Sequence, residues 1–272
     1  MPELPEVETI VRCLAPLLTG RRIVDVAVEW PGILRGTPVE ELHRHIVGQQ
    51  LVGLTRRGKY ILARLSDGAA LAFHLKMTGQ LLLRTSDSPP DRFVRATLLF
   101  DGGVELRFAD ARKFGHILLL NEGSLAALER SLGEEPLDPE FTPERFAELL
   151  RGRSTRIKAL LLDQRLIAGI GNIYADEALF VAGIHPSRSA KSLSPDEIRR
   201  LFEAIREVLR LSIINRGTTF SSYRDGFGQQ GANLYSLKVY RRHGQPCPRC
   251  RTPLERIVVA GRGTHICVRC QR

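Results

Sequence analysis

Four of the five cysteines lie in the last 26 residues of the chain, in two close pairs. Cys247 and Cys250 form one C-x2-C pair, Cys267 and Cys270 form the other, and sixteen residues separate the pairs. Four thiolates at this spacing suit tetrahedral Zn²⁺, and four sulfur ligands leave no open position for water. The pattern therefore predicts one structural zinc ion in a small C-terminal module, in a reducing compartment. We expect the fifth cysteine, Cys13, to be a small buried apolar residue.

The segment around these cysteines is strongly basic. Residues 238–272 carry nine Lys and Arg against one acid, Glu255, which is a local net charge of +8 in a chain whose total is +10. The insert between the pairs contains the apolar run 257–259 and then Gly261-Arg262-Gly263, which predicts a β-hairpin with Arg262 at its tip. A zinc hairpin of this charge is typical of a finger that binds DNA or RNA. The alternative is a zinc staple whose basic surface is only solvated.

The composition of the whole chain agrees with a nucleic-acid partner. Its 272 residues are enough for one large or two ordinary domains, and 43% hydrophobic residues can build a real core. Charge alone would also fit a basic enzyme with another substrate. No apolar run approaches the roughly 20 residues of a membrane span, and the acidic start is unlike a secretory signal. We therefore expect a cytoplasmic, nucleoid-associated protein without a membrane partner and, by default, a monomer.

The first half of the chain is predicted to be mainly β-structure behind one helix. Apolar residues recur at helical spacing from Leu4 to Leu18, and Gly20 is a suitable stop. Alternating or apolar runs follow, and two of the turns between them are hairpin signals. These patterns predict a strand-rich domain over residues 1–132. The expected strands cover 23–30, 61–65, 69–75, 97–100, 104–108 and 117–120.

The composition changes after residue 132. Residues 133–143 are rich in proline and acid and are typical of a linker. Ser194-Pro195-Asp196-Glu197 is a capping box, and the helix that it starts should run to about Ile214. The glycine-rich residues 217–233 suggest a mobile loop. We therefore predict an α+β chain in three parts: a strand-rich domain, a helical domain over 133–237 and a zinc module over 238–272.

The chain begins Met1-Pro2-Glu3. Pro2 is small enough for Met1 to be removed, which would leave a secondary amine at the end of the chain with a carboxylate beside it. An α-amino group has a reference pKa of about 7.7–8.0, so a useful fraction is neutral near physiological pH. Such an amine can attack a carbonyl or acetal carbon. An exposed N-terminal proline has little structural use, so this start favours covalent chemistry.

The start Pro2–Glu8, joined to the C-terminal finger, resembles the formamidopyrimidine-DNA glycosylase family. The resemblance implies a base-excision repair enzyme that excises 8-oxoguanine and formamidopyrimidines from duplex DNA and then cleaves the abasic strand. It also implies an N-terminal β-sandwich and a helix–two-turns–helix domain, with double-stranded DNA bound between them. Five further segments resemble family motifs, in the family's order: 57–60, 74–79, 112–115, 169–174 and 261–264.

The resemblance gives four residues a role in catalysis. The Pro2 nitrogen would attack C1′ of the damaged nucleotide and displace the base, and the resulting Schiff base is an electron sink for β,δ-elimination. Glu3 would protonate the sugar ring oxygen or shuttle a proton. Lys59 resembles the proton donor of β-elimination, and Arg262 resembles the phosphate-binding arginine and donor of δ-elimination. Taken by itself, Lys59 would be interpreted as a solvated surface charge.

Excision from a duplex requires the target nucleotide to be flipped out, and side chains must fill the hole that it leaves. Met77, Arg112 and Phe114 match the void-filling residues of the family, where an arginine can bond the orphaned base while apolar side chains wedge into the stack. The alternative places Met77 and Phe114 in the core. His74 and Asn172 match phosphate contacts, and Asn172 lies in a glycine turn before a helix. A histidine on a strand is otherwise more often a core residue.

Residues 217–233, which open with Thr218 and Thr219, resemble the loop that caps the everted base in this family. The chain departs from the family pattern at two positions. The usual DNA-contacting histidine falls at Phe93, where nearby arginines could replace it electrostatically. A lysine that is common in the family falls near Arg153, which could take its phosphate contact.

Two other functions remain as alternatives. The endonuclease VIII branch of the same fold prefers oxidised pyrimidines and typically starts Pro-Glu-Gly-Pro-Glu, whereas this chain has Leu4 and the Met77, Arg112 and Phe114 set of the purine branch. A non-catalytic zinc-finger DNA-binding protein would have no need of Pro2 and its neighbouring acid. The residues alone predict a basic zinc protein that binds nucleic acid, and the chemistry comes from the resemblance.

Overall fold

The computed structural model describes residues 2–272, which fold as two compact units. Within the described range, the first comprises residues 2–131 and Asn215–Leu234, and the second comprises Leu132–Ile214 and Tyr235–Arg272. The glycine-rich segment therefore folds with the strand-rich part of the chain, although it follows the helical part in sequence. The three-part division at 132 and 237 stays a prediction. The expected removal of Met1 concerns a residue outside the described range.

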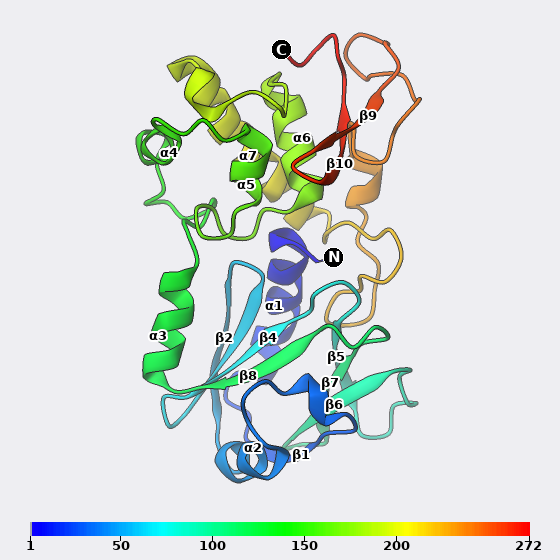
Figure 1. The fold of residues 1–272 in the computed structure, drawn as a ribbon. Helices are drawn as coiled ribbons and strands as arrows, with labels where there is room; N and C mark the ends of the chain where they lie inside the picture. The colour runs from blue at the N-terminus through cyan, green and yellow to red at the C-terminus, as the bar shows by residue number, and fades with distance from the viewer. Residues whose placement is uncertain (1) are drawn as a thin grey trace. The chain divides into compact units, whose positions relative to one another are not determined.

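Two four-stranded antiparallel sheets make up most of the first unit (Figure 1). One has the order β2-β3-β4-β8 and the other the order β1-β6-β7-β5. The predicted strands are all present, but the first ends at Ala27 because Pro31 begins the short helix η1 (Pro31–Ile33). The strands are β1 Ile23–Ala27, β2 Leu51–Arg57, β3 Tyr60–Leu65, β4 Ala70–His74, β5 Gln80–Thr85, β6 Val94–Phe100, β7 Val104–Ala109 and β8 His116–Leu120.

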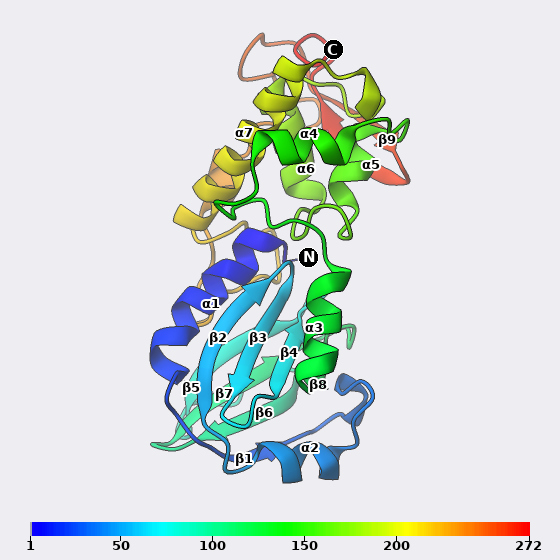
Figure 2. The same ribbon diagram turned by 90° about the vertical axis from the view of Figure 1, so that its left-hand side faces the viewer.

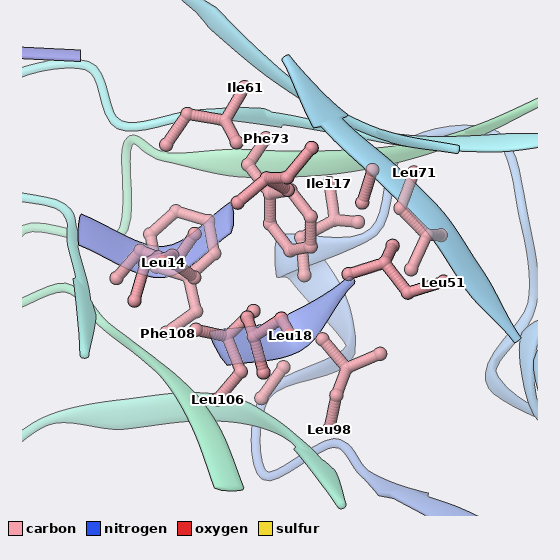
Figure 3. Packing of buried hydrophobic residues seen from close by; sticks show 14 of the residues in the cluster. Leu14, Leu18, Leu51, Ile61, Leu71, Phe73, Leu98, Leu106, Phe108 and Ile117 are labelled. Atoms are coloured by element: carbon pink, nitrogen blue, oxygen red, sulfur yellow. The ribbon is translucent and has the colours of Figure 1, made fainter. Parts of the chain in front are cut away.

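The predicted N-terminal helix is present as α1 (Leu4–Leu18), and its apolar face enters the core between the sheets. Figure 3 shows Leu14 and Leu18 of α1 close to Phe108 of one sheet and Phe73 of the other. All four side chains are 0% exposed. Burial of each such side chain stabilises the fold by about 1.5–3 kcal/mol. Helix α1 is thus held against both sheets of the sandwich.

The outer face of β4 is covered by α3 (Glu122–Ser131), which lies along the β4 and β8 side of its sheet (Figure 2). Leu125 of α3 packs on Ala70 and Ala72, whose small side chains allow the helix to approach. Because both faces of β4 are covered, its five residues are all buried and show no alternation. A further short helix, α2 (Val39–Ile46), packs beside β1.

The second unit is helical apart from one hairpin. An aromatic cluster of Phe141, Phe146 and Phe202 fills part of its core, with ring centroids 5.5 to 6.1 Å apart. The predicted capping box is confirmed, because Ser194 N–H donates to Glu197 Oε2 over 2.8 Å and Glu197 N–H donates to Ser194 Oγ over 3.3 Å. The helices are α4 Pro143–Leu150, α5 Ile157–Leu162, α6 Asn172–Ala182 and α7 Pro195–Ile214, with the short η2 Ala190–Ser192. The short helix η3 (Asn233–Ser236) begins in the last residues of the first unit and ends in the second.

The predicted zinc hairpin is confirmed as β9 (Glu255–Val259) and β10 (Arg262–Ile266). Ala260 and Gly261 form its turn with φ of +50° and +71°, and Arg262 pairs with Val259 at the first position of the ladder. Across residues 2–272, the helices are all too short or too polar to cross a membrane.

Candidate active site and metal centre

The four C-terminal cysteines converge on one point. Their Sγ atoms all lie within 4.8 Å of one another, and two of the separations are 3.4 Å (Cys250 to Cys267) and 3.9 Å (Cys247 to Cys270). Zn–S bonds of about 2.3 Å in a tetrahedron place sulfurs about 3.8 Å apart, so the arrangement fits one zinc ion. Four sulfur ligands make this ion structural, as the sequence predicts.

Replacing one zinc ligand tests this centre. We expect Cys250→Ser to lose the ion, because three thiolates hold zinc far less tightly, and with it the hairpin that carries Arg262. Structural zinc contributes about 10–16 kcal/mol to the folding of isolated fingers, so the loss should be essentially complete. Metal content and affinity for duplex DNA are the measurements. The matched control is Cys13→Ser on α1, which should keep one zinc per chain; full zinc occupancy in Cys250→Ser would contradict the assignment.

Two buried acids of α6 attach this module to the helical unit. The Glu177 carboxylate accepts the backbone N–H groups of Lys238, Val239 and Tyr240 over 2.7, 2.9 and 2.8 Å. Burial raises the pKa of Glu177, while these N–H groups oppose the shift. The neighbouring Asp176 accepts the N–H of His265 over 2.9 Å. Neither acid is predicted from the sequence, and the signal for them is an acidic pair inside an otherwise apolar helix.

The predicted nucleophile lies at the start of α1. Pro2 is buried and Glu3 is only 3% exposed. Glu3 caps the helix: its carboxylate accepts the N–H of Glu6, and its own N–H donates to Glu6 Oε2 over 2.8 Å. The positive end of the helix dipole favours an anion at this position. Pro2 and the ordered carboxylate of Glu3 therefore lie side by side at the N-terminus of α1.

Glu6 links this point to the glycine-rich segment. Its Oε1 accepts the N–H of Thr218 over 2.8 Å, and the carboxylate is 1% exposed. Thr218 and Thr219 are buried at 3% and 7% exposure, and Thr219 Oγ1 accepts the N–H of Gly231 over 3.0 Å. The two threonines therefore close the base of the segment, and its exposed residues, including Phe227, lie further along. Glu6 is not among the site residues predicted from the sequence.

Lys59 lies in the turn between β2 and β3 and is 7% exposed, so it is not a solvated surface charge. The next residue, Tyr60, pairs across the sheet with His74, and their rings meet edge-on at 4.7 Å. His74 is 8% exposed at the end of β4. Lys59 and His74 thus lie close together, as we expect for two residues proposed to contact the DNA backbone.

The three predicted void-filling residues meet at the surface of the first unit. Met77, Arg112 and Phe114 are exposed, and Arg112 donates to Met77 Sδ over 3.3 Å while its guanidinium lies 4.6 Å from the Phe114 ring centre. Met77 and Phe114 are 43% and 46% exposed, which excludes the alternative that they are core residues. Side chains of this size at the surface are suited to enter a base stack.

A buried carboxylate holds these residues. Asp110 is 1% exposed and accepts the N–H groups of Arg112, Phe114 and Gly115 over 3.1, 2.8 and 2.7 Å. It also accepts the Thr78 hydroxyl, which is next to Met77. One aspartate therefore orders both loops that carry the exposed side chains. Asp110 is not predicted from the sequence, because nothing local distinguishes it from other aspartates in turns.

Phe93 lies next to this cluster. It is 47% exposed, and its carbonyl accepts the N–H of Asp110 over 2.9 Å. Its φ of +63° is unusual for an aromatic residue. The guanidinium groups of Arg92 and Arg95 lie 5.0 and 5.9 Å from the ring centre. Two cations therefore accompany Phe93 where the family pattern has a histidine.

In the second unit, the turn of the zinc hairpin rests on the start of α6. Asn172 Nδ2 donates to the Gly263 carbonyl over 2.9 Å, next to Arg262. The fully buried Lys158 donates to Asp176 Oδ1 and Thr264 Oγ1, both over 2.6 Å. Arg262 itself is exposed, and the buried Oδ1 of Asn172 has no hydrogen-bond partner among residues 2–272. This arrangement presents a cation and a helix start at one place, which suits a phosphate.

Among the described residues, no hydrogen bond or ion pair connects Arg153 with the site of Asn172 and Arg262. Arg153 is exposed between α4 and α5, and its guanidinium donates to the Leu149 carbonyl over 2.7 Å. Lys158 instead occupies the interior beneath the hairpin. It was missed because it follows Ile157 in an apolar run, and a lone charge in such a run is the signal that could have found it.

Comparison with known proteins decides the family. Models of the formamidopyrimidine-DNA glycosylase N-terminal domain, of its H2TH domain and of the zinc finger found in FPG and IleRS match residues 1–117, 132–224 and 244–272. The chain belongs to the formamidopyrimidine-DNA glycosylase family. Members of this family are DNA glycosylases of base-excision repair, and the predicted fold class and zinc finger are confirmed.

Relatives in this family are similar over the whole chain. The formamidopyrimidine-DNA glycosylases of Herpetosiphon aurantiacus and Chloroflexus aurantiacus are 50% and 48% identical over 272 residues, which are all of this chain and 100% and 98% of the relatives. Two solved structures of Lactococcus lactis FPG, one a variant with Fapy-dG-containing DNA and one with abasic-site DNA, have TM-scores of 0.92 at 36% identity. They cover 100% and 99% of both chains, respectively.

Proposed function

We propose that the protein excises oxidised purines from duplex DNA and then cleaves the abasic strand. The observation that carries this proposal is the exposed cluster of Met77, Arg112 and Phe114 on the buried Asp110. Such a cluster is suited to fill a duplex from which a nucleotide has been flipped, and flipping is needed only by proteins that act on the base. A zinc-finger protein that merely binds DNA has no need of it.

The proposed chemistry begins at Pro2. Its nitrogen lone pair forms a bond to C1′ as the glycosidic bond breaks and the damaged base leaves with a proton. The Glu3 carboxylate takes the proton that the attacking nitrogen loses and passes it to the ring oxygen, so the C1′–O4′ bond opens and the Pro2 nitrogen becomes a cationic iminium; the proton of the leaving base comes from water. The ordered position of Glu3 at the helix start supports this role. No step in this sequence requires the zinc ion.

Strand cleavage follows from the iminium. Loss of a C2′ proton expels the 3′ phosphate in β-elimination, and a second elimination expels the 5′ phosphate; water then releases Pro2. Lys59 is the proposed proton donor and phosphate contact in the first step, with Arg262 in the second. His74 and Asn172 are proposed contacts to further phosphates. The segment that opens with Thr218 and Thr219 is proposed to cap the everted base, and Phe93 and Arg153 are proposed as peripheral DNA contacts.

The substrate class is tested by release of free base. With duplexes that carry one 8-oxoguanine or one formamidopyrimidine opposite cytosine, we expect single-turnover excision at least about tenfold faster than with an oxidised pyrimidine. Mass spectrometry of the released base is the measurement. The pyrimidine comparison is needed because Lactococcus lactis FPG has also been crystallised with oxidised-pyrimidine DNA. Faster release of the pyrimidine would favour the endonuclease VIII alternative.

A further inference from the structure

Two buried imidazoles stack on each other inside the first unit. His74 on β4 pairs directly with His116 on β8, and their rings lie 5.4 Å apart at an angle of 19°. Tyr60 on β3 packs edge-on against His74 at 4.7 Å. The two histidines are 8% and 4% exposed. The His74 ring is therefore held between two aromatic neighbours.

The hydrogen bonds of His74 determine which ring nitrogen carries the proton. Its Nδ1 accepts the backbone N–H of Lys76 over 3.0 Å. An acceptor nitrogen has no proton, so the proton of the neutral ring is on Nε2. A doubly protonated ring would set one donor against another at Nδ1. Lys76 has a φ of +49°, so loss of this bond would also release an uncommon backbone conformation.

The charges around the pair also oppose protonation. Burial lowers the pKa of His74 to about 3, and Lys76, His116 and Lys59 contribute to the shift. Burial, Arg35 and Lys76 lower the pKa of His116 to about 4. The groups that face the two rings are thus cations from the β2–β3 turn, from the turn after β4 and from the segment after η1, with Tyr60 on β3. None of them is a carboxylate that would favour an imidazolium.

The lowered pKa values also determine how the stability of the fold depends on pH. Both folded pKa values lie below the ordinary 6.5, so the unfolded chain binds more protons than the folded one between about pH 3 and 6.5. The stability contributed by the neutral pair is therefore complete above pH 6.5 and is lost as the pH falls through this window.

We infer that His74 contacts the DNA backbone as an uncharged Nε2–H donor. Among residues 2–272, His74 Nε2 has no hydrogen-bond partner, so this donor is available to a phosphate oxygen. The inference rests on the proposed function in one respect, that His74 contacts DNA at all. His74 then contributes a hydrogen bond without releasing a counterion, whereas Lys59 and Arg262 contribute charge. His116 is a positioning residue that keeps the ring in place.

The protonation state is tested in the free, full-length protein. We expect ¹⁵N NMR of imidazole-labelled protein to show His74 as the neutral Nε2–H form from pH 8 to pH 5. The exposed His243 is compared in the same spectra. Equivalent, protonated nitrogens of His74 at pH 6, or the Nδ1–H form at any pH, would overturn the inference. This readout does not depend on DNA or on catalysis.

The contact itself is tested by salt dependence of binding to a duplex with an uncleavable abasic analogue. His74→Phe keeps the ring packing and removes the donor, so we expect about tenfold weaker binding with an unchanged slope of log K against log salt. Arg262→Gln is the comparison and should flatten the slope by about 1. A flatter slope for His74→Phe would overturn the neutral donor. If His74→Phe binds as tightly as the unsubstituted protein, and NMR shows a neutral ring at His74, then His74 makes no phosphate contact.

The role of His116 is tested with two substitutions. We expect His116→Ala to weaken DNA binding several-fold, which is about tenfold less than the loss of a folded site would cause. The spectra should then show a mixture of His74 ring orientations. His116→Phe restores a stacked ring and should restore both affinity and a single His74 signal. Failure of His116→Phe to restore either one would contradict the positioning role.

Discussion

A chain that keeps any residue ahead of Pro2 is expected to lose excision and strand cleavage together and still bind DNA. The preceding peptide bond converts the secondary amine into an amide, whose nitrogen lone pair is delocalised into the carbonyl and is not available for attack on C1′. Removing a covalent nucleophile costs several orders of magnitude in rate, so we expect a fall of at least about 10³-fold in single-turnover excision. The measurement is base release and nicking of an 8-oxoguanine duplex.

Because Pro2 is buried, the control must show that the extra residue leaves the fold intact. Affinity for the uncleavable abasic analogue should stay within about threefold of the processed protein, since the phosphate contacts and the exposed cluster are unchanged. Treatment with an aminopeptidase that exposes Pro2 should restore activity in the same sample. Full excision by the blocked chain would exclude Pro2 as the nucleophile.

The second large effect is expected at the ion pair beneath the zinc hairpin. Lys158 and Asp176 are both 0% exposed in their side chains and lie 2.6 Å apart. Lys158→Met leaves an uncompensated carboxylate in the interior, so we expect it to lower the free energy of unfolding by about 3–5 kcal/mol. Chemical denaturation monitored by zinc release is the measurement, because the hairpin on this pair joins the two cysteine pairs, with Cys250 before β9 and Cys267 after β10.

A double-mutant cycle separates the pair from its packing. Asp176→Asn removes the charge but keeps an oxygen for the N–H of His265, so the Lys158→Met and Asp176→Asn double variant should recover about 2 kcal/mol or more over either single change. The exposed pair of Arg165 and Asp163 is the matched control. Arg165→Met should cost less than about 1 kcal/mol, because its guanidinium is 82% exposed. Additive losses at the buried pair would contradict the account.

The features that sequence alone predicts are those whose signal lies within a few residues. The cysteine spacing, the hairpin turn at Gly261, the apolar period of α1 and the capping box at Ser194 all have local causes. Helix α3 escaped prediction because only Leu125 on it is buried, which leaves little amphipathic pattern. Strand β4 lacks alternation for the opposite reason, since both of its faces are covered.

The supporting residues of the site could not be found in this way. Asp110, Glu6 and Lys158 act through partners that are distant in sequence, such as Thr218, which is 212 positions from Glu6. A carboxylate that orders three N–H groups looks in sequence like any acid near a turn. The resemblance identified the side chains proposed to touch DNA, while the structure was needed to find what holds them in place.

The most direct test of the account is reduction of the covalent intermediate. Borohydride added to the processed protein with a duplex containing 8-oxoguanine opposite cytosine should reduce the iminium to a stable amine. We predict a protein–DNA adduct in high yield, with peptide mass spectrometry placing the sugar on the nitrogen of Pro2. Absence of an adduct from protein that binds the same duplex, or an adduct on a lysine such as Lys59, would contradict the central claim.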